Sequence, residues 1–181
     1  MSECKAASAQ LELGNAMRNV NETNDAYFDS RLYHQAIGCL LFLPGGTRPD
    51  IANAVCKLSQ HCETPTKGDW KRVKHVFRYL KGTKDYALNF SRTGKHIEVF
   101  ADADWANDRA DAKSISGYVV KLAGAAVIWR SRKQGCVATS TTHAEYIAMY
   151  EALTEVMWLK AFLQETELSV FFYAVCYQCG Q

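Results

Sequence analysis

The sequence predicts an α/β fold in which several helices precede a sheet, and three observations support this prediction. Apolar residues recur at helical spacing between Tyr33 and Leu80. After Gly94 they alternate along the chain, which is typical of half-buried strands. A long helical pattern then returns after Thr142. The 181 residues suffice for one ordinary domain, or for one domain and a substantial piece of another. A content of 48% hydrophobic and 22% charged residues is typical of a globular protein.

Three helices are expected in the first half. The first runs from Tyr33 and must stop before Pro44, because proline and the two glycines after it do not continue a helix. A second helix starts at Pro49, and a third runs from an N-cap at Thr66 to about Leu80. The buried stripe of the third helix would consist of Trp70, Val73, Phe77 and Leu80.

Four strands are expected in the second half. The first three cover 96–103, 117–124 and 125–131, and a tight hairpin near Gly124 joins the last two into a meander. A further strand over 169–177 follows a long helix. The first strand would bury Ile97, Val99 and Ala101 on one face.

The long helix is expected to begin with a capping box formed by Thr142 and Glu145 and to end at about Glu165. Its core stripe would consist of Tyr146, Met149, Leu153, Val156, Leu159 and Leu163. The predicted order of the second half is therefore βββαβ.

Charge is uneven along the chain, although the net charge is only +2. Residues 67–95 hold nine Lys or Arg and two acids, and a group of acids follows them. A basic element next to an acidic pocket suits a polyanion held near a bound metal, and two separate solvated surfaces are the other interpretation. The acids are Glu98, Asp102, Asp104, Asp108 and Asp111.

The longest apolar run is well short of the roughly 18 residues that a membrane-spanning helix needs. The first residues lack the basic and apolar parts of a secretory signal. We therefore expect an intracellular protein without a membrane partner. The cytoplasm is its expected compartment, and the nucleus is the alternative. Seven irregularly spaced cysteines do not indicate a disulfide framework.

Asp102 and Asp104 are two residues apart on a predicted strand, so their carboxylates leave the same face near its end. Glu145, near the start of the long helix, could bring a third oxygen donor to that place. Hard oxygen ligands select Mg²⁺ or Mn²⁺, and two such ions about 4 Å apart promote phosphodiester hydrolysis. Caps or solvated loop acids are the alternative role for these aspartates.

Ordered sequence motifs run along the chain. The stretch YHQAIGCLLFLPGGTRPDIANAVCKLSQ resembles the segment that joins reverse transcriptase to ribonuclease H in the Pol polyproteins of copia-type LTR retrotransposons. The motifs DADWA, KSISGYV, WRSRKQ and HAEYIA resemble the ribonuclease H domain of the same family. The resemblance covers about residues 1–168.

This resemblance implies a linker over 1–30, a helical connection segment over 31–95 and a partial RNase H-like domain over 96–181. The implied sheet is mixed: strands one to three are antiparallel, and strand four is parallel to strand one. Asp102 and Glu145 would hold the metal, with Asp104 supporting the catalytic site. The implied reaction is hydrolysis of the RNA strand of an RNA/DNA hybrid with two Mg²⁺ (or Mn²⁺) ions, and the implied partners are nucleic acid and the remainder of a Pol polyprotein.

Three departures from the family pattern weaken the expected metal site. Tyr177 stands where the family carries a third catalytic Asp, and a phenol with a pKa of about 10 stays protonated at neutral pH. A fourth family acid and the last elements of the domain do not follow in this sequence, so we expect an incomplete domain. His143 stands where the family often has an acid. We therefore expect ribonuclease H activity to be weak or lost.

Basic side chains are the candidates for phosphate contacts, with a plain solvated face as the alternative. Three functions stay open at this point: a weak ribonuclease H, a catalytically inactive remnant that binds nucleic acid, and a product without retained activity. The candidate nucleic-acid-binding residues are Lys71, Lys74, Arg78, Lys81, Arg132 and Lys133.

Overall fold

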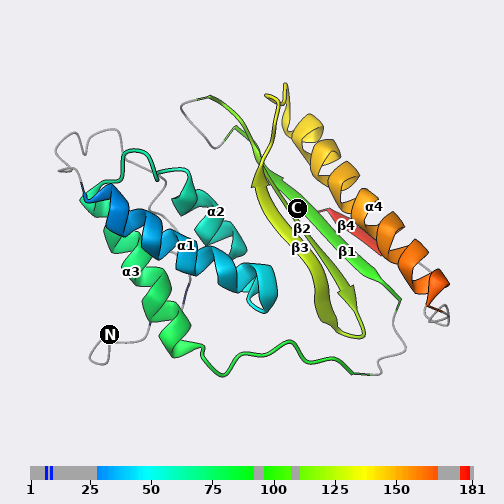
Figure 1. Ribbon diagram of the computed structural model, residues 1–181. Helices are drawn as coiled ribbons and strands as arrows, with labels where there is room; N and C mark the ends of the chain where they lie inside the picture. Colours follow the sequence, from blue (N-terminus) through cyan, green and yellow to red (C-terminus); the bar gives the residue numbers. More distant parts are fainter. Residues whose placement is uncertain are drawn as a thin grey trace. The chain divides into compact units, whose positions relative to one another are not determined.

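The computed structural model describes residues 7, 9, 28–91, 96–106 and 111–166, together with the backbone of 176–179 (Figure 1). The chain divides into two compact units, Met1–Ala87 and Leu88–Gln181. Nearly all of the predicted linker over 1–30 lies outside the described residues. The first unit is helical and the second contains the sheet, so the predicted α/β class with helices first is confirmed.

The helical unit contains α1 (Ser30–Gly46), a 3-10 turn η1 (Pro49–Ile51), α2 (Ala52–Ser59) and α3 (Lys67–Gly82). The prediction that the first helix stops before Pro44 is wrong, because α1 includes this proline. The backbone N–H groups of Thr47 and Arg48 both donate to the carbonyl of Leu43, which closes the last turn after the proline.

Helix α3 begins at the predicted N-cap. The Thr66 hydroxyl accepts from the backbone N–H of Asp69 at 3.1 Å, and the Asp69 carboxylate accepts from the backbone N–H of Thr66 at 3.0 Å. This is a complete capping box.

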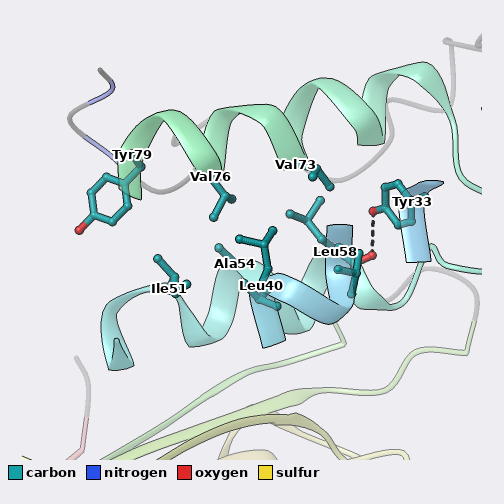
Figure 2. Packing of buried hydrophobic residues seen from close by; sticks show 10 residues of the cluster. Tyr33, Leu40, Ile51, Ala54, Leu58, Val73, Val76 and Tyr79 are labelled. Carbon is teal, nitrogen blue, oxygen red and sulfur yellow. Dashed lines mark hydrogen bonds between the residues drawn. The ribbon is translucent and has the colours of Figure 1, made fainter. Parts of the chain in front are cut away.

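The core of the helical unit lies between its three α-helices (Figure 2). The hydroxyl of Tyr33 donates to the carbonyl of Leu58 at 2.9 Å, which satisfies a polar group inside the core. The predicted stripe of α3 is partly wrong, because Trp70, Phe77 and Leu80 are only half-buried. The residues that α3 buries completely or almost completely are Val73, Val76 and Tyr79, together with Asp69 of the cap.

The second unit contains β1 (Glu98–Asp104), β2 (Ile115–Leu122), β3 (Ala125–Lys133), α4 (Thr141–Glu165) and β4 (Cys176–Cys179), with strand order β3-β2-β1-β4. Strands β1, β2 and β3 form the predicted antiparallel meander. The hairpin between β2 and β3 is confirmed at its predicted place, where Ala123 and Gly124 both have positive φ angles.

Strand β4 pairs in parallel with β1, with Ala101 opposite Cys179. The final strand was predicted over 169–177, and most of that range lies outside the described residues.

Helix α4 packs along β1 and β2 (Figure 1). The predicted capping box at its start is wrong: Ser140 is the N-cap and its hydroxyl accepts from the backbone N–H of His143 at 3.1 Å. Because His143 then occupies the third helical position, Glu145 lies beyond the reach of a capping box.

The predicted inner stripe of α4 is also partly wrong. Tyr146 and Leu153 are exposed and Met149 is half-buried, whereas Val156, Leu159 and Leu163 are buried as predicted. Alanines occupy the rest of the inner face, and small side chains let the helix approach the sheet closely. These fully buried alanines are Ala144, Ala148 and Ala152. None of the described helices is long and apolar enough to cross a membrane.

Candidate functional site

Asp102 and Asp104 lie at the end of β1, and both side chains are exposed. Val99 and Ala101 precede the aspartates on β1 at odd-numbered positions, and their side chains are buried in the core that α4 covers. Asp102 and Asp104 are at even-numbered positions of the same strand. The aspartates therefore occupy the sheet face opposite α4, where water solvates the carboxylates. One Asp102 oxygen accepts from the backbone N–H of Ala103 at 2.9 Å. Two buried carboxylates would require a metal ion or a basic partner to balance their charge, but these exposed carboxylates are solvated by water and do not.

Glu145 is half-buried in the second turn of α4. The start of this helix is fixed by Gln134, a buried side chain that follows β3. The Gln134 amide nitrogen donates to the hydroxyl of Ser116 at 2.9 Å and to the carbonyl of Ala144 at 3.0 Å. Because Ser116 pairs with Ala103 on β1, Gln134 connects the helix start to the part of the sheet that carries the aspartates.

The described residues do not fit a two-ion site. No group of three or more His, Cys, Asp or Glu side chains lies close enough to hold a metal within the part of the chain that the structure describes. Strand β4, the neighbour of β1 on its other side, has the sequence CYQC and carries no carboxylate. Magnesium takes most of its protein ligands from carboxylates, so this sheet edge offers too few of them.

Two acids of the predicted acidic group, Glu98 and Asp111, are paired with lysines. Asp111 lies 2.9 Å from the Lys133 ammonium and 3.7 Å from that of Lys113, and Glu98 lies 3.8 Å from that of Lys121. Asp108 lies outside the described residues. The charges of Glu98 and Asp111 are therefore balanced locally by lysines, whereas the other two described acids of the group, Asp102 and Asp104, are exposed.

The two basic candidates on β3 are both engaged with acids. The Arg132 guanidinium donates to Glu151 of α4 at 2.6 Å, and Lys133 pairs with Asp111. A phosphate at this place would compete with carboxylates for the same cations.

The four basic candidates on α3 lie away from the core of the helical unit. Lys71, Lys74 and Lys81 are exposed, and Arg78 is half-buried. Their side of the helix is separate from the buried side formed by Val73, Val76 and Tyr79. Of the two predicted basic surfaces, the one on α3 offers exposed ammonium groups for phosphate contacts.

Comparisons with known proteins identify the origin of the chain. A retrovirus-related Pol polyprotein from a transposon of Nicotiana tabacum is 45% identical over 136 residues, which are 75% of this chain and 10% of the polyprotein. The secreted RxLR effector protein 161 of Plasmopara viticola is 44% identical over 136 residues, which are 96% of that protein. The chain is homologous to retrovirus-related Pol polyproteins of copia-like plant transposons, and it is a retrotransposon-derived protein.

This Pol-derived chain also matches 66% of an uncharacterized mitochondrial protein of Arabidopsis thaliana, with 32% identity over 162 residues. It spans only about a tenth of the length of the Pol polyproteins that it matches. No family model and no solved structure matches it. The expected origin in a retrotransposon Pol polyprotein is therefore confirmed, and the assignments to a connection segment and a ribonuclease H stay predictions.

Gln134 has a structural role in this Pol-derived chain that its place in the motif WRSRKQ does not reveal. A polar residue after a strand gives no signal of burial. Trp105, next to the aspartates, is 46% exposed and donates its indole N–H to the carbonyl of Ala138 at 3.2 Å. This bond fixes one edge of the ring and leaves part of its surface accessible.

Proposed function

We propose that this chain is an RNase H-like segment of a retrotransposon Pol protein in which the ancestral reaction is weak or lost. That reaction is Mg²⁺- or Mn²⁺-dependent hydrolysis of the RNA strand of RNA/DNA hybrids. The order of elements supports the proposal: three antiparallel strands, a long helix packed on them, and a strand parallel to the first. Asp102 at the end of β1 and Glu145 in α4 are the residues that would carry the reaction.

The proposed loss of ribonuclease H activity rests on the absence of a carboxylate side chain from β4. This strand lies directly beside β1, yet its four residues are Cys, Tyr, Gln and Cys. A metal site that loses one anionic ligand loses several kcal/mol of transition-state stabilisation, and about 4 kcal/mol corresponds to roughly a thousand-fold in rate.

A labelled RNA/DNA hybrid incubated with the full chain and Mg²⁺ or Mn²⁺ tests this proposal. We expect cleavage at least about a thousand-fold slower than that of a complete ribonuclease H. Asp102→Asn is the site variant, and Asp111→Asn is the matched control because Asp111 pairs with lysines. Robust cleavage that Asp102→Asn abolishes and Asp111→Asn leaves intact would contradict the proposed loss.

A second candidate function is nucleic-acid binding through α3, which the exposed ammonium groups of Lys71 and Lys74 favour. Such binding weakens with salt, because each phosphate contact releases counterions. We expect Lys71→Gln/Lys74→Gln to weaken hybrid binding and to lower the salt slope by about 2. Lys57→Gln/Lys160→Gln is the matched control with the same net charge. Affinity that is flat between about 50 and 200 mM salt would exclude this function.

A further inference from the structure

Large apolar side chains cover the outward face of α4. Tyr146 is 64% exposed, Tyr150 72%, Leu153 38% and Met157 71%. Their spacing of four, three and four residues places them in a stripe about 60° wide on a helix of 3.6 residues per turn. This outer stripe lies roughly opposite the alanine face that packs on the sheet.

Rotation of α4 about its axis cannot bury the outer stripe against the sheet. Its inner face is already buried against β1 and β2, where the alanines leave no room for aromatic rings. Trp158 and Phe162 stack with ring centroids 5.6 Å apart and form a separate apolar pair near the end of the helix, outside the outer stripe. A helix that is apolar on two sides is normally buried on both, and a continuous exposed apolar patch marks an interaction site.

We propose that the outer stripe binds the outer stripe of a second copy of this chain, with the two α4 helices antiparallel. The stripe is symmetric about a point between Glu151 and Ala152. A two-fold axis through this point places Tyr146 against Met157 of the second copy. It also places Tyr150 against Leu153 of that copy. Self-complementarity of this kind is what a two-fold interface requires, and the spacing is that of helices packed side by side.

The charges of α4 are compatible with this contact. Glu151 is bonded to Arg132 at 2.6 Å, and the Tyr118 hydroxyl donates to Glu155 at 3.2 Å. Both acids are thus engaged by their own sheet and do not oppose their copies across the axis. Lys160 would lie opposite His143 of the second copy.

The size of the stripe indicates a weak dimer. A fully buried aromatic side chain removes roughly 150–250 Å² from water, so the exposed parts of these four side chains amount to about 400 Å² per copy. About 800 Å² in total lies at the low end of weak and transient interfaces. We therefore expect a dissociation constant of about 10–100 μM.

Sedimentation equilibrium of the full chain between about 5 and 300 μM tests the proposal. We expect the mass to rise from 20.3 kDa toward twice that value, and Tyr150→Lys to weaken association at least tenfold. Phe42→Lys is the matched control, because this aromatic side chain on α1 is 83% exposed and lies outside the stripe. Unchanged helix content by circular dichroism shows that both variants fold.

A monomer at every concentration would overturn the proposal and would assign the stripe to another occupant, such as a different part of a Pol polyprotein. Association that Tyr150→Lys leaves unchanged would also overturn it. The antiparallel register has a test of its own: mixing Tyr150→Cys with Leu153→Cys should give more cross-linked dimer than either variant alone. Preferential cross-linking of Tyr150→Cys to itself would contradict that register.

Discussion

Replacing Arg48 with methionine removes the cation at the centre of a polar network in the helical unit. The Arg48 guanidinium donates to both oxygens of Asp50, at 2.9 and 2.7 Å. It also donates to the carbonyl and the hydroxyl of Thr83, at 3.1 and 2.6 Å, where α3 ends. The same guanidinium lies 5.6 Å from the ring centroid of Tyr79 and 5.9 Å from that of Tyr86. Arg48 therefore joins the η1 turn to the end of α3.

The expected cost follows from the burial of the partners. The side chain of Arg48 is 10% exposed and that of Asp50 is 25% exposed, so methionine leaves the carboxylate with limited access to water. Breaking a buried ion pair costs about 3–5 kcal/mol, and partial solvation of Asp50 reduces this figure. We expect Arg48→Met to destabilise the helical unit by about 2–4 kcal/mol.

Hydrogen exchange of the full chain, resolved by peptide, measures this effect within the helical unit alone. Peptides of α3 should exchange about a hundred-fold faster in Arg48→Met, since about 1.4 kcal/mol is a tenfold change. Arg31→Met on the exposed side of α1 is the matched control. Protection of α3 that Arg48→Met leaves within threefold of wild type would refute the assignment of this network as a stabilising element.

Three further predictions concern single residues. Burial raises the pKa of Asp50, but hydrogen bonds from Arg48 and Tyr79 outweigh burial and lower this pKa below the ordinary 3.8. The ionised Asp50 carboxylate should therefore contribute its full stabilisation above pH 3.8, and this contribution should be lost as the pH falls through the pKa of Asp50 in the folded protein. Denaturant unfolding from pH 2.5 to 6 should show the difference from Asp50→Asn shrink only in acid, and a difference that persists unchanged in acid would contradict this. Ala148→Leu should cost about 1–3 kcal/mol by overpacking the helix against the sheet, whereas its exposed counterpart Ala161→Leu should be nearly neutral in thermal unfolding. Ser140→Ala should destabilise α4 by about 1 kcal/mol by removing its cap, and equal protection of the first turn of α4 from hydrogen exchange in wild type and variant would argue against that cap.

The first three strands, the hairpin and the cap of α3 could be predicted because each has a local signal. Alternation identified the buried face of β1, and Gly124 supplied the positive φ angle that a two-residue hairpin needs. Thr66 with Asp69 forms a capping box three residues apart. Such signals depend only on neighbouring residues, so no knowledge of tertiary contacts is required.

The inner face of α4 could not be predicted from periodicity, because large apolar residues occupy two sides of the helix. Hydrophobicity favoured Tyr146 and Leu153, but close packing on the sheet selected Ala148 and Ala152 instead. The cap of the same helix was ambiguous among successive hydroxyl residues, and the geometry of the turn selected Ser140.

The candidate site was predicted only in part, because spacing along the chain does not give burial. Asp102 and Asp104 do share a face, as alternation requires, but that face is exposed. The pairing of Arg132 with Glu151 and of Lys133 with Asp111 depends on residues distant in sequence. No local pattern indicates such partners.

The most direct test of the proposed loss of function is the single-turnover rate of RNA cleavage in a labelled RNA/DNA hybrid, measured with excess protein and Mn²⁺. At the protein concentration that binds the hybrid fully, we expect wild type to cleave at least about a thousand-fold more slowly than a complete ribonuclease H and close to the rate of Asp102→Asn. A wild-type rate comparable to that of a complete ribonuclease H, lost in Asp102→Asn while hybrid binding is retained, would contradict the account and identify a working nuclease.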